Sequence, residues 1–180
     1  RAFVQFVLCI IQSAILTLSY VGVAIVYGNE LPETGILTNY PMVEFYISIF
    51  LLMYAADAMG IMISCLVKKE EAANVLAPYI LIVQLIFSGI LFAMEGMADY
   101  ISYVMISRWG MEALGSIANL NDLPLKIQMT VPTVPHEFES RFDSTPEHLL
   151  TVWAVLFGFI VVFLLVGNIL LHRVSKDTKG

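Results

Sequence analysis

The chain has 180 residues, of which 59% are hydrophobic and 13% are charged, and its formal net charge is -6. Soluble domains carry about 25% charged and about 45–50% apolar residues, so this composition excludes an ordinary soluble domain and indicates a membrane protein. The excess of acidic residues also argues against a nucleic-acid partner, because few basic side chains are available to neutralise phosphates. The two cysteines, Cys9 and Cys65, lie in or beside apolar runs and indicate no disulfide framework.

Four apolar runs are long enough to cross a bilayer as helices. They predict an all-α membrane protein with spans at about 3–27, 41–67, 74–93 and 149–171. The chain begins with Arg1 inside an apolar region, and no small-residue cleavage site follows the first run. We therefore expect it to be part of a longer polypeptide, without a signal peptide at this point.

Lysine and arginine residues predict the orientation. Lys68 and Lys69 lie in the short turn between the second and third runs, and further basic residues lie at both ends of the chain. These segments are expected to be cytoplasmic in a multi-pass protein of the plasma membrane. The long connection over 95–148 is then on the outer side.

The second run contains the most deeply placed charged residue, Asp57. An intramembrane carboxylate needs a partner or a proton, and Gln12 and Asn168 are the predicted partners. A structural or conformational role is favoured over substrate contact. Glu44, near the outer end of the same run, is expected to be solvated.

The third run is interrupted by polar and helix-breaking residues. Over 74–92 it contains Pro78, Gln84 and the pair Ser88-Gly89. Proline removes a backbone donor, and a glutamine in the middle of a membrane needs a partner or water. This pattern predicts a helix that faces other protein or a pathway as well as lipid.

The outer connection is predicted to contain two short helices, over about 94–106 and 109–120. Both are too short to cross a bilayer, so interfacial or re-entrant positions are expected, buried in protein or beside a cavity. Arg108 is expected to pair with Glu95 or Glu112.

The second part of this connection is proline-rich and acidic, and a solvated loop is favoured over a metal site. The spacing of HEFES differs from that of a HExxH zinc site. No nucleophile and base are paired in the sequence, so no catalytic residue is predicted. The cluster consists of His136, Glu137, Glu139, Asp143, Glu147 and His148.

The segment KKEEAANVLAPYILIVQLIFSGILF (68–92), followed by SRWGMEALGSIANL (107–120), resembles the membrane domain of type-2 ABC exporters. The resemblance is to the G subfamily and its bacterial counterparts, in which a Phe-Ser-Gly-aliphatic-aliphatic run ends the fifth span. An Arg-aromatic-Gly-x-x-Ala-Leu element then follows in a short outer helix. The outer connection has no cysteine, which favours a bacterial-type member. The chain would form spans three to six of six.

The resemblance implies the permease portion of an ATP-driven exporter, in which two permease subunits form the substrate path. It also implies that ATP and Mg are bound by a separate nucleotide-binding domain on the same polypeptide or on another subunit. The chain contains no GxxxxGK[ST] motif, so it is not predicted to be an enzyme itself.

The resemblance also implies roles for particular residues. Ile90 and Leu91 match an aliphatic pair that closes the outer end of the path, where bulky side chains would dewet a constriction. The candidates for the path wall share or adjoin one helix face, although ordinary helix packing is the favoured explanation of this pattern. They are Leu81, Gln84, Leu85 and Ser88. The charged turn can contact the nucleotide-binding domain or remain solvated, and it consists of Lys68, Lys69, Glu70 and Glu71.

Two other functions remain open from the residues alone. A proton- or ion-coupled secondary transporter would use Asp57 as its relay. A four-span scaffold protein would need no polar residues along a path, and the polar residues of the second and third runs argue against it. A membrane enzyme is the least supported class.

Overall fold

The computed structural model describes residues 2–27, 32, 34–67, 70–91, 94, 96–122 and 138–177, with the backbone alone for 2, 70, 71 and 172–177. All elements within these ranges are helical, which confirms the predicted all-α class. The longer helices are α1 (Ala2–Tyr27), α2 (Pro41–Leu66), α3 (Glu70–Ile86), α5 (Ile106–Ile117) and α7 (Pro146–Asp177), and the short ones are α4 (Met97–Ser102), η1 (Leu120–Asp122) and η2 (Ser140–Phe142).

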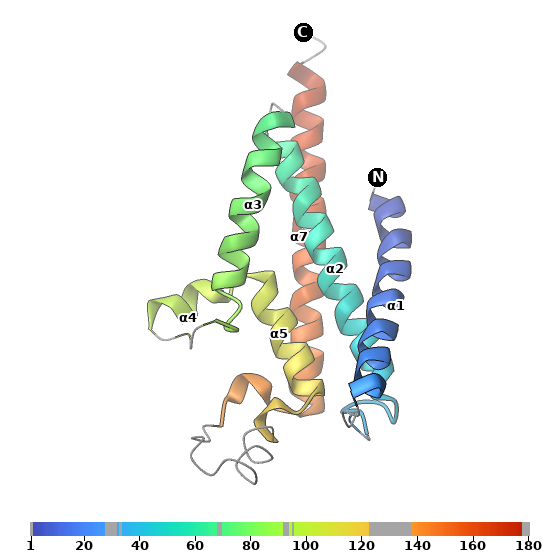
Figure 1. The fold of residues 1–180 in the computed structure, drawn as a ribbon. Coiled ribbons are helices and arrows are strands. Elements are labelled where there is room, and N and C mark those ends of the chain that lie inside the picture. The colour runs from blue at the N-terminus through green and yellow to red at the C-terminus, as the bar shows by residue number, and fades with distance from the viewer. Residues whose placement is uncertain are drawn as a thin grey trace.

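The helices form an elongated bundle (Figure 1). Helices α1, α2 and α7 extend through most of its length, whereas α3 and α5 each accompany about half of it. The beginning of α1 and the end of α7 lie at the same end of the bundle as the end of α2 and the start of α3. This agrees with the predicted arrangement, in which both chain ends and the charged turn face the same side.

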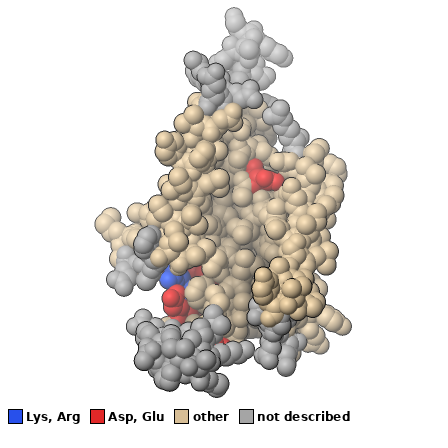
Figure 2. Space-filling model, viewed as in Figure 1, with Lys and Arg blue, Asp and Glu red and all other residues tan. Residues whose placement is uncertain are grey.

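Three of the described helices are long and apolar enough to cross a membrane, over Phe3–Tyr27, Pro41–Leu66 and Pro146–Leu171. Their surface is mostly uncharged: Figure 2 shows a broad face of uncharged side chains over α1, α2 and α3, and most of the charged groups in this view lie near α4 and α5. A surface of this kind is suited to lipid or to another membrane subunit.

The predicted span over 74–93 is shorter in the structure. Helix α3 ends at Ile86, and its apolar part extends only over Ala72–Ile86. The reason lies in the next residues, because the hydroxyl of Ser88 donates to the Leu85 carbonyl at 2.7 Å and accepts from the Ile90 N–H at 3.2 Å. Gly89 then adopts a left-handed conformation with φ of 81°. A serine hydroxyl that bonds nearby backbone groups, followed by a left-handed glycine, ends a helix.

Helix α5 packs between α2 and α7 and forms the core with them. Ile106 and Ile117 from α5 are buried together with Leu156 from α7. The approach of α5 to α2 is close at Gly110, since an added Cβ there would lie 2.6 Å from Leu52 Cδ1. The absence of a side chain at this position therefore allows the short helix to enter the bundle.

Helices α4 and α5 correspond to the two short helices predicted in the outer connection, with shifted boundaries. Helix α5 begins beside the middle of α7 and runs to the end of the bundle where α7 begins (Figure 1), and there the Ser144 hydroxyl donates to the Ser116 carbonyl at 2.7 Å. Its twelve residues rise about 18 Å. If Pro146–Leu171 crosses the bilayer, the start of α5 lies near the membrane centre, as expected for a re-entrant helix.

Glu44 is not solvated as predicted but fully buried. Its carboxylate accepts backbone N–H bonds from Ile36, Leu37 and Thr38 at 2.8, 2.7 and 2.6 Å. The preceding loop passes so close that a Cβ on Gly35 would lie 2.5 Å from Glu44 Oε1. The loop backbone thus replaces water as the partner of the carboxylate, which makes its burial tolerable.

Candidate functional site: a helix junction and the cavity beside it

Helices α3 and α5 meet end to end through a reciprocal pair of hydrogen bonds. The Ser107 backbone N–H, in the first turn of α5, donates to Gln84 Oε1 at 3.0 Å. The Ser107 hydroxyl donates in turn to the Gln84 backbone carbonyl, in the last turn of α3. Each bond satisfies a backbone group that its own helix leaves without a partner. Gln84 and Ser107 therefore join the end of α3 to the beginning of α5.

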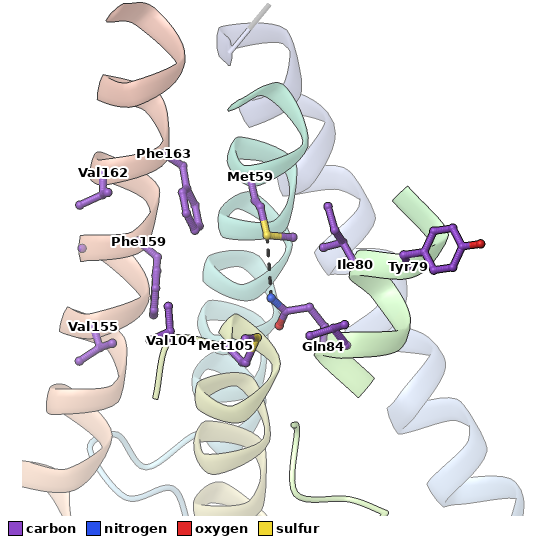
Figure 3. A pocket seen from close by; sticks show the side chains of 12 residues that line it. Met59, Tyr79, Ile80, Gln84, Val104, Met105, Val155, Phe159, Val162 and Phe163 are labelled. Atoms are coloured by element: carbon purple, nitrogen blue, oxygen red, sulfur yellow. Dashed lines mark hydrogen bonds between the residues drawn. The ribbon is translucent and has the colours of Figure 1, made fainter. Parts of the chain in front are cut away.

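The junction also fixes the direction of the Gln84 amide. Because Oε1 accepts the Ser107 N–H, the amide nitrogen must point the other way. Gln84 Nε2 faces α2 and lies 3.9 Å from the sulfur of Met59 (Figure 3). A thioether is only a weak acceptor, so the two N–H groups of this amide keep most of their donor capacity.

A cavity of about 740 Å³ that is widely open to the surface of the bundle lies beside the junction, between α2, α3 and α7, with the segment before α5 at one end. Figure 3 shows Phe159 and Phe163 from α7 on one side and the Gln84 side chain on the other. The lining of the cavity is almost entirely apolar, and it includes the side chain of Gln84, which carries an amide group. The lining residues are Met59, Tyr79, Ile80, Val83, Gln84, Val104, Met105, Val155, Gly158, Phe159, Val162 and Phe163.

The predicted path residues do not all face this cavity. Gln84 lines it, but Leu81 and Leu85 point away and are 66% and 49% exposed. Ser88 is buried at the end of α3, where it terminates the helix. Of these four path residues, only Gln84 lines the space between helices of this chain. Leu81 and Leu85 lie on the surface of α3 that faces away from this space.

The predicted gate residues follow the end of α3. Ile90 and Leu91 lie in the irregular segment after Ser88, and they are 55% and 52% exposed. Of the residues predicted to contact a nucleotide-binding domain, Lys68 and Lys69 lie outside the described residues. Glu70 and Glu71 begin α3, and only their backbone is described.

Arg108 is the centre of a buried charged cluster at the start of α5. Its guanidinium contacts Asp99 Oδ1 at 2.7 Å and Glu112 Oε1 at 3.1 Å, and also donates to the Ser102 hydroxyl. The guanidinium carbon lies 3.7 Å from the centre of the Tyr103 ring. Burial raises the pKa of Glu112, while the hydrogen bond and the charge of Arg108 oppose this rise. The cluster links α4 to α5 and neutralises a cation that is only 3% exposed.

This arrangement confirms one of the two predicted partners of Arg108, Glu112. Glu95, the other, lies outside the described residues. Asp99 was not predicted, although it lies nine residues before Arg108, in the other short helix.

Asp57 has a different partner from those predicted. The Cys9 thiol of α1 donates to Asp57 Oδ2 at 3.0 Å, whereas neither Gln12 nor Asn168 bonds to Asp57 in the described part of the chain. Cys9 is fully buried between α1 and α2. The pair belongs to the interface of these two helices and lies apart from the cavity lining.

The acidic outer cluster is only partly described, because His136 and Glu137 lie outside the described residues. Arg141 pairs with Glu139 at 3.0 Å, and His148 Nε2 lies 3.0 Å from the Arg141 carbonyl oxygen. These contacts hold η2 against the beginning of α7. Within the described residues, no group of three His, Cys, Asp or Glu side chains is arranged to hold a metal ion.

Sequence reasoning missed several residues of the site. Ser107, the second residue of α5, was not singled out. Gly158 and the two phenylalanines of α7, Phe159 and Phe163, were treated as an ordinary spanning run. A glycine in the middle of such a run was the one available signal.

Comparison with known proteins gives two matches. A family model described as ABC-2 type transporter matches residues 1–118. An ABC transporter ATP-binding/permease protein of Mycobacterium tuberculosis is 28% identical over 164 residues, which cover 87% of this chain and 17% of that protein. No solved structure matches.

Proposed function

This chain belongs to the ABC-2 type transporter family, and from that premise we propose that it forms half of a dimeric substrate path in an ATP-driven exporter. As a member of that family it is a transmembrane permease component. The direction of transport, the second permease subunit and the site of ATP hydrolysis belong to the proposal.

The exposed face of α3 is the observation that carries the dimeric path. Helix α3 contacts its own bundle along one face, through residues such as Ile80 and Gln84. The rest of its surface leaves Leu81, Leu85 and Val75 exposed by 66%, 49% and 61%. A helix with so little of its apolar surface covered gains stability when further membrane helices pack beside it, and in the proposed dimer these include helices of a second subunit. The two leucines predicted for the path wall belong to this uncovered surface.

Ile90 and Leu91 are proposed as the outer gate. They lie in the irregular segment a few residues after the helix end and are more than half exposed, so they are free to meet the same residues of a second subunit. Two pairs of aliphatic side chains in a narrow passage exclude water and ions until the passage widens. The left-handed Gly89 before them allows the segment to turn out of the helix axis.

ATP hydrolysis is proposed for a nucleotide-binding domain that uses ATP and Mg and contacts the turn at Lys68–Glu71. The name of the mycobacterial relative joins an ATP-binding and a permease part in one protein. That supports a module on the same polypeptide, although this chain spans only 17% of that relative. The end of α2 and the start of α3, which flank this turn, lie toward the end of the bundle where α1 begins and α7 ends (Figure 1), which suits a common cytoplasmic face in the plasma membrane.

Cross-linking tests the dimer. Leu85→Cys, made with Cys65 replaced by alanine, should form a covalent dimer with a short bifunctional thiol reagent, because the same face of α3 from two subunits would line the path. Leu18→Cys is the matched control, since Leu18 is 70% exposed on α1, away from α3. Equal cross-linking of both variants, or cross-linking of the control alone, would contradict the proposed interface.

Vesicle transport tests the source of energy. Inside-out vesicles that contain the assembled protein should accumulate a hydrophobic fluorescent dye when ATP is added, and vanadate should stop this accumulation. The alternative is a proton-coupled carrier in which Asp57, bonded to the Cys9 thiol, is the relay. Accumulation driven by a pH gradient without ATP, and lost in Asp57→Asn, would favour that alternative.

A further inference from the structure

We propose that Arg141 of η2 is a positioning residue for the outer gate, because its guanidinium holds the turn at Gly89 from which Ile90 and Leu91 continue. We call residues 87–91 the gate segment. The inference rests on the proposed role of Ile90 and Leu91 as a gate. Opening of this gate then requires that the outer connection withdraws Arg141 from the turn.

Arg141 occupies the space that a side chain at position 89 would need. A Cβ added at Gly89 would lie 2.8 Å from Arg141 Nη1 and 3.7 Å from its Cζ. Gly89 also has a φ of 81°, which favours glycine by itself. Glycine at this position therefore meets two requirements, the turn that ends α3 and the close approach of a guanidinium from the far end of the outer connection.

The guanidinium is placed where a helix end attracts a cation. Ile86 is the last residue of α3, and the turn at Gly89 follows it, so Arg141 lies near carbonyl groups that the helix leaves without backbone donors. These carbonyls carry a partial negative charge, which a cation stabilises. The planar guanidinium can serve two partners at once: Nη2 binds Glu139 Oε2 at 3.0 Å, while Nη1 lies against Gly89.

The backbone of η2 is itself fixed to the bundle. Asn121 uses its whole side-chain amide for this purpose, because Nδ2 donates to the carbonyls of Glu139 and Phe142 at 3.1 and 3.0 Å and Oδ1 accepts the Glu139 N–H at 3.1 Å. At the beginning of α7, His148 Nε2 lies 3.0 Å from the Arg141 carbonyl oxygen. The guanidinium therefore extends from a fixed base, and its contact with Gly89 restrains the gate segment relative to α5 and α7.

The charge of Arg141 faces the bundle more than the water outside. Its side chain is 18% exposed, compared with 44% for its partner Glu139. Burial raises the pKa of Glu112 on α5, and the charges that oppose this rise are those of Arg108, His148 and Arg141. Arg141 thus acts on the interior of the outer half as well as on the end of α3.

The gate segment has few other restraints from distant parts of the chain. Ile90 and Leu91 are 55% and 52% exposed. The Ser88 hydroxyl bonds the Leu85 carbonyl and the Ile90 N–H, and both of these groups belong to α3 or to the gate segment itself. Arg141 adds a contact from a different element, so its loss should let the gate segment move without unfolding α3.

Thiol reactivity at position 91 tests the proposal. The assembled protein, with Leu91→Cys and with Cys65 replaced by alanine, is placed in lipid nanodiscs without ATP and reacted with a membrane-impermeant maleimide. Arg141→Met should raise the reaction rate about 2- to 30-fold, as expected when a cation is lost from a helix end. Arg141→Lys should restore most of the slow rate, because the charge remains.

Tyr40→Cys is the control reporter, since Tyr40 is 71% exposed in the loop before α2, and its rate should be equal in all variants. An unchanged rate at position 91 in Arg141→Met would overturn the proposal. A rate that rises equally at positions 40 and 91, or an Arg141→Lys variant as fast as Arg141→Met, would do the same.

Two glycines separate the contact from backbone strain. Gly89→Ala places a methyl group where Arg141 Nη1 lies, whereas Gly96→Ala, at a φ of 59°, meets nothing within 4 Å. Only Gly89→Ala should raise the rate at position 91. Because Gly89→Ala and Arg141→Met remove the same contact, the double variant should stay within about twofold of the faster single variant. Effects that multiply would refute a shared contact.

The result is separable from the proposed transport function. Reactivity is measured in the resting protein, so Arg141 can hold the turn in a protein that fails the vesicle-transport test. Conversely, an ATP-driven exporter in which Arg141→Met leaves position 91 unchanged would retain the proposed function and lose the positioning role of Arg141.

Discussion

The junction between α3 and α5 allows a quantitative prediction for Gln84→Met. Methionine keeps the length and apolar body of the side chain but removes the acceptor of the Ser107 N–H, which lies 3.0 Å away. In the expected re-entrant position, where α5 starts near the membrane centre, this N–H has no water to replace the lost partner. An unsatisfied buried donor costs about 1–3 kcal/mol, so the start of α5 should open more often by a factor of about 5–150.

Hydrogen exchange measures this opening directly. The assembled protein is exchanged in nanodiscs, and the amide of Ser107 is followed in peptides that cover the start of α5. Its exchange in Gln84→Met should be faster by the factor given above, while amides in the middle of α7 keep their rates. The matched control is Gln12→Met on α1, because the side chain of Gln12 is exposed and makes no hydrogen bond in the described part of the chain.

A second variant shows whether the two bonds act as one unit. Ser107→Ala removes the hydroxyl bond to the Gln84 carbonyl and leaves the backbone bond in place. If the junction opens as a whole, the double variant should exchange more slowly than the product of the two single effects predicts. Unchanged exchange at Ser107 in Gln84→Met would refute the reasoning, because the acceptor would then contribute nothing to the start of α5.

Three further predictions concern the fold around the site. Glu44→Ala should lower the free energy of unfolding by about 2–4 kcal/mol, because three loop N–H groups lose a charged acceptor; thermal unfolding in detergent measures this, and an unchanged midpoint would contradict it. Arg108→Leu should destabilise by about 3–5 kcal/mol, because it leaves Glu112 buried without its partner, and Arg108→Leu combined with Glu112→Leu should recover part of this loss in the same assay. Gly110→Leu should separate α5 from α2 because Leu52 occupies the space, so proteolysis in the outer connection should become faster than in the unaltered protein.

The local pattern of the sequence was sufficient for most of the helices. Long apolar runs predict where a membrane can be crossed, and three of the four predicted runs match helices α1, α2 and α7 within a few residues. The order of short helices in the outer connection also followed from their apolar spacing. The end of α3 did not follow, although Ser88-Gly89 was recognised as unusual, because a continuing apolar composition masks a helix end that depends on side-chain hydrogen bonds.

The environment of single polar residues was predicted less well. Glu44 was expected in water, and this prediction was wrong. Gln12 and Asn168 were candidate partners of Asp57, and neither bonds to it in the described part of the chain. The partners of Glu44 are backbone groups of a loop that folds back on it, and the partner of Asp57 is a thiol on another helix. Sequence spacing gives no measure of which helix faces which, so contacts between distant segments remain undetermined until the helices are packed.

Composition and periodicity by themselves therefore determined that this chain lies in a membrane and that its helices alternate in direction. They also determined that the third run carries polar side chains whose hydrogen-bonding groups need partners. Only the tertiary structure decided that Gln84 and Ser107 complete each other's helices and that Gly158 borders an open cavity. The physical reason is that burial in a membrane is a local property of a side chain, whereas a hydrogen-bond partner or an unfilled space depends on a second segment whose position is set by packing.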